Sequence, residues 1–338
     1  MNRNLFIAFL FCVASIVVHG QEKKFSFTTE KMSSPFTIIL YDEDSAHANY
    51  LAKQCFQLVD SFVNIFSDYI DTSEISRLSK SSGSDRLVPV SPALFDIILE
   101  SKKAFVLSNG AFDITMGPII RLWRKARKEK IFPEPSAIAE KMKKVGFDKM
   151  EINEANRSIK LTQPEMVLDL GGIAQGYIAD KVLDRLKQNN IKGALIDVSG
   201  DIATGNPPPQ KKGWTVGINL PESEQLQKQL LLISNMSVST SGDIYQFIEH
   251  DGKRYSHIID PKTGYGVTTQ KNVTVIANNT TTADWLATAC SILTLKKAKR
   301  LAKRLHAEVL IAERKNDKIV QSSTKKFSSF YYSNSRND

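Results

Sequence analysis

Short β-branched segments follow one another through the second half of the chain, with few helical patterns between them. They are Ala194–Val198, Trp214–Ile218, Leu230–Ile233, Tyr255–Ile259 and Asn272–Ala277. Parallel neighbours in a sheet need a long crossover, usually a helix, whereas antiparallel neighbours can follow one another directly. The sequence therefore predicts an α+β fold built on antiparallel sheets with packed helices, rather than a doubly wound parallel sheet.

Apolar residues recur at helical spacing in four other segments. We expect helices over Ser45–Phe66, from Ser91 to about Gly110, from just after Gly172, and from about Thr282 toward His306. The second helix has favourable end signals, because serine is a preferred N-cap and Pro92 suits the first helical position. Each helix should bury one apolar face.

The first twenty residues have the pattern of an export signal. Arg3 gives a positive start, Leu5–Val18 is apolar, and small residues precede a cleavage point before Gln21. We expect residues 1–20 to be removed and residues 21–338 to form one large domain or two closely joined ones. Export places the mature protein in the periplasm, or at the membrane periphery on the outer side of the inner membrane.

The chain is basic, with a formal net charge of +9 and clusters at Arg121–Lys130 and Lys296–Arg304. Such a balance can attract nucleic acid, an anionic membrane or a phosphorylated small molecule. Export makes nucleic acid the least favoured partner, and we expect none. Solvated faces of helices account for most of these charges. Cys55 lies on one apolar helix stripe and Cys290 follows another, so we expect buried thiols rather than a metal or redox site; a disulfide between them stays open.

The run Met166–Val182 reads as a strand that stops at Gly171-Gly172 and continues as an amphipathic helix. Glycines let the backbone approach a ligand closely, and the N–H groups at a helix start favour an anion. The run contains neither G-x-G-x-x-G nor a P-loop. It therefore predicts an anion site, although an ordinary chain reversal explains the same pattern.

Two further patterns carry candidate chemistry. Asp284 and Thr288 are four residues apart on an expected helix, so their oxygens share one face and suit Mg²⁺. The pair is equally explained by a carboxylate that complements the helix dipole and a threonine bonded to its own helix. His257 stands before a Pro-Lys-Thr-Gly turn and can act as a base near neutral pH, but a structural histidine fits the same position.

Ordered motifs run through nearly all of the chain after residue 20. In the first half they are MSSPF from Met32, DY from Asp68, SEISR from Ser73, GAFDITMGP from Gly110 and LW from Leu122. In the second half they are MVLDLGGIAQGYIAD, STSGDIYQF, GKRYSHIIDPKTGYGV and NVTVIANNTTTADWLAT. With these motifs in this order, the chain resembles the FAD:protein FMN transferases, the ApbE or flavin-trafficking family.

The resemblance implies two T-fold-like halves in one globule, with FAD in a cleft between them, and a single transferase domain over residues 21–338. It implies a Mg²⁺-dependent transfer of the FMN phosphoryl group from FAD to a Ser or Thr hydroxyl of an acceptor protein, with release of AMP. A subunit of a membrane redox complex is one candidate acceptor. The oligomeric state stays open.

Carried over position by position, the resemblance also implies site residues. The flavin-nucleotide contacts are Met32, Tyr69, Ala111, Phe112, Asp113, Asp169, Gln175 and Ile259. The metal ligands are the Gly172 carbonyl, Asp284 and Thr288, and the base that activates the hydroxyl is His257. Gln175 stands where many relatives carry Lys, and Ala287 lacks a carboxylate that some relatives place beside the metal.

Two other functions remain compatible with the sequence. With water as the acceptor, the same site would make a Mg²⁺-dependent FAD pyrophosphatase that yields FMN and AMP. The choice between water and a protein hydroxyl depends on how well the site excludes water. A non-catalytic periplasmic flavin-binding protein is the second alternative, and it would have no need for Asp284, Thr288 and His257 together.

Overall fold

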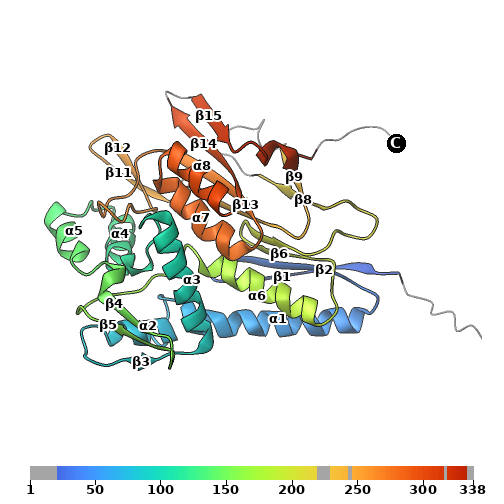
Figure 1. Cartoon of the computed structure of the whole chain (residues 1–338), viewed down its shortest axis with the longest axis horizontal. Coiled ribbons are helices and arrows are strands. Elements are labelled where there is room, and N and C mark those ends of the chain that lie inside the picture. Colours follow the sequence, from blue (N-terminus) through green and yellow to red (C-terminus); the bar gives the residue numbers. More distant parts are fainter. Residues whose placement is uncertain (1–20, 219–228, 243–245, 316–317, 333–338) are drawn as a thin grey trace, which may run out of the picture.

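The computed structural model describes residues 21–218, 229–242, 246–315 and 318–332. The expected export signal, residues 1–20, lies outside the described residues. One eight-stranded sheet forms the centre of the molecule (Figure 1). In spatial order its strands are β1 (Lys23–Lys31), β2 (Ser34–Asp42), β6 (Ala194–Val198), β7 (Asp201–Thr204), β10 (Ser237–Gly242), β13 (Lys271–Ala277), β14 (Glu308–Lys315) and β15 (Lys318–Ser323). Every neighbouring pair is antiparallel, which confirms the predicted fold class.

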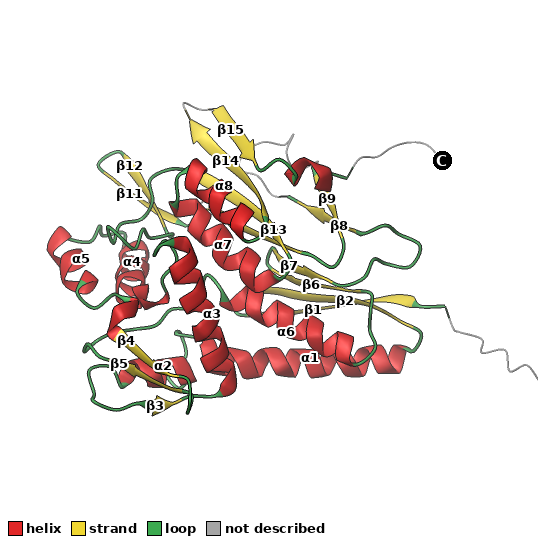
Figure 2. Cartoon of the chain, viewed as in Figure 1, coloured by secondary structure: helices red, strands yellow, loops and turns green. Residues whose placement is uncertain are grey.

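Helices cover one face of this sheet, as Figure 2 shows. They are α1 (Ser45–Phe66), α6 (Ala174–Gln188), α7 (Thr280–Ile292) and α8 (Leu295–Arg304), with α3 (Pro92–Ser108) packed against α1 and α7. The α3 end signals are confirmed, because Ser91 Oγ accepts a hydrogen bond from the Leu94 amide at 3.2 Å and Pro92 opens the helix. The main core lies between these helices and the sheet.

The opposite face of the sheet is covered by a small hairpin. Strands β8 (Trp214–Gly217) and β9 (Leu230–Ile233) pair with each other, and a 3₁₀ turn at Phe327–Phe330 packs beside them. Side chains alternate between the two faces of a strand, so within β6 Ile196 enters the main core while Leu195 enters this second core. The central strands of the sheet are therefore buried on both faces, whereas the edge strands β1 and β15 carry exposed residues.

A third core lies at the end of the molecule formed by α4 (Gly117–Glu129) and α5 (Pro135–Met142) (Figure 1). The β11 (Phe247–His250) and β12 (Lys253–Ser256) hairpin packs against it. Trp123 is fully buried there and donates from Nε1 to the Gly264 carbonyl oxygen at 2.8 Å. The remaining elements are α2 (Glu74–Lys80), a sheet of β3 (Val88–Pro89), β5 (Ser158–Leu161) and β4 (Met150–Asn153), and 3₁₀ turns at Ile114–Met116 and Phe147–Lys149.

Three expectations about local structure are wrong. Met166–Leu170 is an extended segment rather than a strand, because its amides bond outside any ladder: Leu168 to Ser79 Oγ and Asp169 to the Ile114 carbonyl. The helix expected from about Thr282 to His306 is two helices, since residues 293 and 294 are both extended. The segment expected as a strand at Tyr255–Ile259 leaves β12 after Ser256.

Cys55 and Cys290 are buried as predicted and form no disulfide with each other, and burial raises their pKa to about 11 and about 12. Within the described part of the chain, no helix combines the length and apolar character that a membrane span requires.

Candidate active site

The Gly171-Gly172 turn lies at the centre of the predicted site. Asp169 Oδ1 accepts a hydrogen bond from the Gly171 amide at 2.8 Å and so shapes the turn. A Cβ atom added to Gly172 would lie 3.0 Å from Thr288 Oγ1 and 3.2 Å from Phe112 Cε2. Glycine therefore allows this backbone to approach α7, and the structure brings Gly172, Thr288 and Phe112 together.

Helices α6 and α7 cross closely just after this turn. A Cβ atom added to Gly176 would lie 2.4 Å from the Thr280 carbonyl oxygen, so only glycine fits there. The Gly176 amide donates to Asp284 Oδ2 at 3.0 Å. The N-terminus of α6 thus faces the Asp284 carboxylate. Asp284 and Thr288 are four residues apart and lie on the same side of α7.

Asp284 is 7% exposed, and burial is the main reason why its pKa lies well above the usual range. A second buried carboxylate, Asp201, adds like-charge repulsion to Asp284; its own pKa is raised to about 7, chiefly by burial. Ser239 donates a short hydrogen bond to Asp201. Two buried carboxylates that repel each other would be stabilised by a cation between or beside them.

The oxygen donors here suit a hard divalent cation. They are the Asp284 carboxylate, the Thr288 hydroxyl and the Gly172 carbonyl, and Mg²⁺ characteristically uses one or two protein carboxylates and completes its shell with water and phosphate. Among the described residues, no group of three or more His, Cys, Asp or Glu side chains is arranged to hold a metal ion. One carboxylate, one hydroxyl and one carbonyl leave most of an octahedral shell open, so these donors fit a metal that is shared with a phosphate-bearing substrate.

An arginine connects the glycine turn to Tyr69. Arg124, on α4, binds Asp169 Oδ2 through Nη2 at 2.6 Å and Asp68 Oδ2 through Nη1 at 2.5 Å. Its guanidinium also lies over the Tyr69 ring, 4.2 Å from the ring centre. Tyr69 is 77% exposed, so its ring is held at the surface by stacking on Arg124 and is available to a ligand.

His257 follows β12, and its amide donates to the Gln246 carbonyl at 2.8 Å. Its Nδ1 atom is buried and has no hydrogen-bond partner among the described residues. Burial, and after it the charge of Arg127, lowers the pKa of His257 to about 4. The imidazole is therefore neutral at pH 7 and can accept a proton.

Arg127 lies one helical turn after Arg124. Its Nη1 atom is buried and likewise has no hydrogen-bond partner in the described part of the chain. Sequence reasoning did not single out Arg124 and Arg127, because most of the positive charges were expected on solvated helix faces. The signal available was their spacing of three on one helix face.

The remaining residues predicted to contact the flavin nucleotide lie in several different parts of the structure. Asp113 caps the 3₁₀ turn by accepting from the amide and hydroxyl of Thr115 at 2.8 and 2.7 Å. Ile259 is buried in the third core, and Gln175 lies in the first turn of α6. Met32 has a positive φ of 52° at the β1–β2 turn and packs against the main core; no described contact joins it to the glycine turn.

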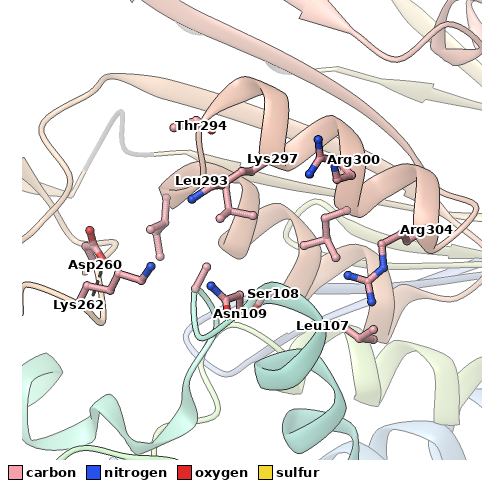
Figure 3. A pocket seen from close by; sticks show the side chains of 13 residues that line it. Leu107, Ser108, Asn109, Asp260, Lys262, Leu293, Thr294, Lys297, Arg300 and Arg304 are labelled. Carbon is pink, nitrogen blue, oxygen red and sulfur yellow. Dashed lines mark hydrogen bonds between the residues drawn. The ribbon is translucent and has the colours of Figure 1, made fainter.

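A cavity of about 320 Å³ lies beside Ala111, between the end of α3, helix α8 and the turn after Ile259 (Figure 3). Lys262 reaches it from the turn and Arg304 from the end of α8. Its wall carries four cationic side chains, Lys262, Lys297, Arg300 and Arg304, and one carboxylate, Asp260. This charge balance favours an anionic ligand next to Ala111.

Comparison with known proteins gives consistent matches along most of the chain. The sequence model of the ApbE family matches residues 32–311. An FAD:protein FMN transferase of Klebsiella pneumoniae is 31% identical over 306 residues, which are 90% of this chain and 93% of that protein. One from Treponema pallidum is 32% identical over 270 residues, 75% of this chain and 74% of that protein.

Solved structures agree with this match. A histidine-to-glycine mutant of the flavin transferase ApbE from Vibrio cholerae superimposes with a TM-score of 0.82 at 25% identity, covering 91% of this chain and 99% of that one. The apo flavinyl transferase ApbE of Pseudomonas stutzeri superimposes with a TM-score of 0.81 at 26% identity, covering 92% and 98%.

Proposed function

The chain belongs to the ApbE family, and from this we propose that it is an FAD:protein FMN transferase, an enzyme that moves the FMN moiety of FAD onto an acceptor protein. The observation that carries the proposal is the meeting of Gly172 with Thr288 beside the buried Asp284, within one network that reaches Tyr69 through Asp169 and Arg124. A flavin-binding protein without catalysis would not need to bury a carboxylate at this cost.

In the reaction, a Ser or Thr oxygen of the acceptor bonds to the FMN-side phosphorus of FAD. The bond between that phosphorus and the oxygen of the AMP phosphate breaks, and its electron pair leaves with AMP. Phosphoryl transfer depends mainly on positioning and on neutralising charge. We assign Asp284, Thr288 and the Gly172 carbonyl to a Mg²⁺ ion, which when bound neutralises charge on the diphosphate.

We assign to His257 the role of accepting the proton from the Ser or Thr hydroxyl of the acceptor protein. Its imidazole is neutral at pH 7, which is the form that accepts a proton. A base is most effective when its pKa is near the working pH, so a pKa of about 4 is low for this role. A phosphate next to Arg127 would offset the charge that lowers this pKa and would move it toward neutrality.

The direct test combines purified protein, FAD, Mg²⁺ and a Thr-containing acceptor domain. The expected result is an acceptor whose mass has grown by one FMN moiety, with an equal amount of AMP released. AMP and FMN in solution with an unchanged acceptor would instead identify a pyrophosphatase. Binding of FAD with no AMP in either arm would identify a flavin-binding protein.

We further propose that the enzyme works after export, on an acceptor outside the cytoplasm such as a subunit of a membrane redox complex. Residues 1–20 support this, because they have the charge and hydrophobicity of a cleavable signal. N-terminal sequencing of protein from the periplasmic fraction should begin at Gln21. A cytoplasmic protein that still begins at Met1 would contradict it.

A further inference from the structure

We propose that Arg127 is a catalytic residue of this enzyme, whose guanidinium binds the FMN-side phosphoryl group beside His257 while that group is transferred. The proposal rests on the proposed function and names a residue that the family resemblance did not supply.

The first argument is the contrast between two arginines on one face of α4. Arg124 has two carboxylate partners and an aromatic face, which satisfy its donors and charge. Arg127, one turn further, has a buried Nη1 without any hydrogen-bond partner in the described part of the chain. An unsatisfied buried donor on a charged group is costly, so each such group calls for a specific explanation, and a catalytic role is one of them.

The second argument is the local charge. Among the described residues, Arg121 and Arg124 pair with Asp68, Arg124 also pairs with Asp169, and Arg127 forms no ion pair with a carboxylate. The cluster is left with one positive charge more than it neutralises. A guanidinium presents its N–H groups in a fork that matches two oxygens of a phosphate, so the ligand that fits this excess is a phosphoryl group.

The third argument is the neighbour. His257 Nδ1 is also buried without a partner in the described residues, and the charge of Arg127 reaches this imidazole. The two nitrogens, one on α4 and one on the segment after β12, thus belong to residues whose charges influence each other. The reacting pair satisfies both: the phosphoryl oxygens accept from Arg127, and the acceptor hydroxyl gives its proton to His257.

In the step itself, the Arg127 N–H groups donate to the non-bridging oxygens of the FMN-side phosphoryl group. The acceptor oxygen bonds to phosphorus on one side, and the bond to AMP breaks on the other. The proton moves to His257, and the positive charge it acquires lies next to the phosphoryl oxygens rather than next to Arg127 alone. Arginines that stabilise transferring phosphoryl groups in other enzymes accelerate the step ~10³–10⁵-fold.

The test uses Arg127→Gln and Arg127→Lys, with Lys128→Gln as the matched control. Lys128 is exposed on the same helix, and its replacement removes the same charge from the next position. We expect Arg127→Gln to lower kcat for FMN transfer at least ~10²-fold, as for other removed transition-state donors, and Arg127→Lys to recover part of it. The control should transfer at the wild-type rate.

A binding measurement separates this role from a structural one. Wild type should bind FMN more tightly than riboflavin, Arg127→Gln should lose most of that preference, and Lys128→Gln should keep it. Transfer by Arg127→Gln at the wild-type rate, or an unchanged FMN preference, would overturn the assignment of Arg127 alone. A wild-type protein that flavinylates no acceptor would overturn the proposed function instead.

Discussion

Replacing His257 by Asn should change how the stability of the protein depends on pH. In the unfolded chain the imidazole binds a proton as the pH falls through 6.5, whereas in the folded protein its pKa is lowered to about 4 by burial and by Arg127. Between these values the unfolded state binds more protons, so the free energy of unfolding falls as the pH falls. The contribution of His257 is fully present above pH 6.5 and is lost by pH 4.

The size of the effect follows from the same two pKa values. Their difference corresponds to about 3 kcal/mol once fully developed, at 1.36 kcal/mol for each pH unit between them. Between about pH 7 and about pH 5 the two titrations give a loss of about 2 kcal/mol. Asn does not titrate, so His257→Asn should be less sensitive to this change in pH than wild type by about 2 kcal/mol.

Urea unfolding at both pH values measures this difference directly. The control is His306→Asn, which removes an exposed histidine with a φ of 53°, a conformation that Asn tolerates well. The control should keep the wild-type pH dependence. If His257→Asn and wild type lose the same free energy between the two pH values, the buried, uncharged state assigned to His257 is refuted.

The same variant tests the chemical role. His257→Asn should lower FMN transfer by ~10²–10⁴-fold with near-normal affinity for FAD, because a general base acts in the transition state and adds little to ground-state binding. The acidic limb of the pH profile should disappear with the imidazole. A parallel collapse of FAD affinity would move His257 to the binding residues.

Three other predictions concern the glycine turn and its ligands. Asp284→Asn keeps an acceptor for the Gly176 amide and removes a buried carboxylate, so in the presence of a chelator its melting temperature should be higher than that of wild type. The variant should also lose Mg²⁺-dependent turnover. Retained turnover would remove Asp284 from the metal site. Gly176→Ala should lower the free energy of urea unfolding by ~1–3 kcal/mol, because its Cβ would lie 2.4 Å from the Thr280 carbonyl oxygen. Gly217→Ala is the control and should not show this loss, since its Cβ would have its nearest neighbour at 3.8 Å. FAD should raise the melting temperature more than riboflavin at matched concentration, since riboflavin lacks the diphosphate; equal shifts would mean that the turn binds no phosphate.

The sequence predicted correctly those helices and strands whose bounds are determined by their own residues. The bounds of α1, Ser45–Phe66, follow from helical periodicity, and those of β6 and β9 follow from short β-branched segments. The start of α3 follows from its N-cap serine and first-turn proline. Antiparallel order followed from the absence of long crossovers after Gly193. These are the features for which the local pattern and the tertiary contacts agree.

The wrong predictions of local structure concern segments whose conformation depends on residues distant in the sequence. Met166–Leu170 has the composition of a buried strand, and it is buried, but its amide partners are Ser79 and the Ile114 carbonyl, far from it in sequence. Periodicity does not separate a buried strand from a buried extended segment. The break between α7 and α8 has no Gly or Pro to announce it, and two extended residues there turn the chain back along the sheet.

The arginines of α4 show why a charge run is the hardest pattern to interpret. Arg121–Lys130 contains Lys125 and Lys128, which are exposed, and Arg124 and Arg127, which are partly buried, and composition does not distinguish them. What separates them is the position of the helix against Asp68, Asp169 and His257, which come from three other segments. Arg124 is explained by its two carboxylates. Arg127 influences the charge of the His257 imidazole and, in the described part of the chain, pairs with no carboxylate; a bound phosphoryl group would complete this arrangement.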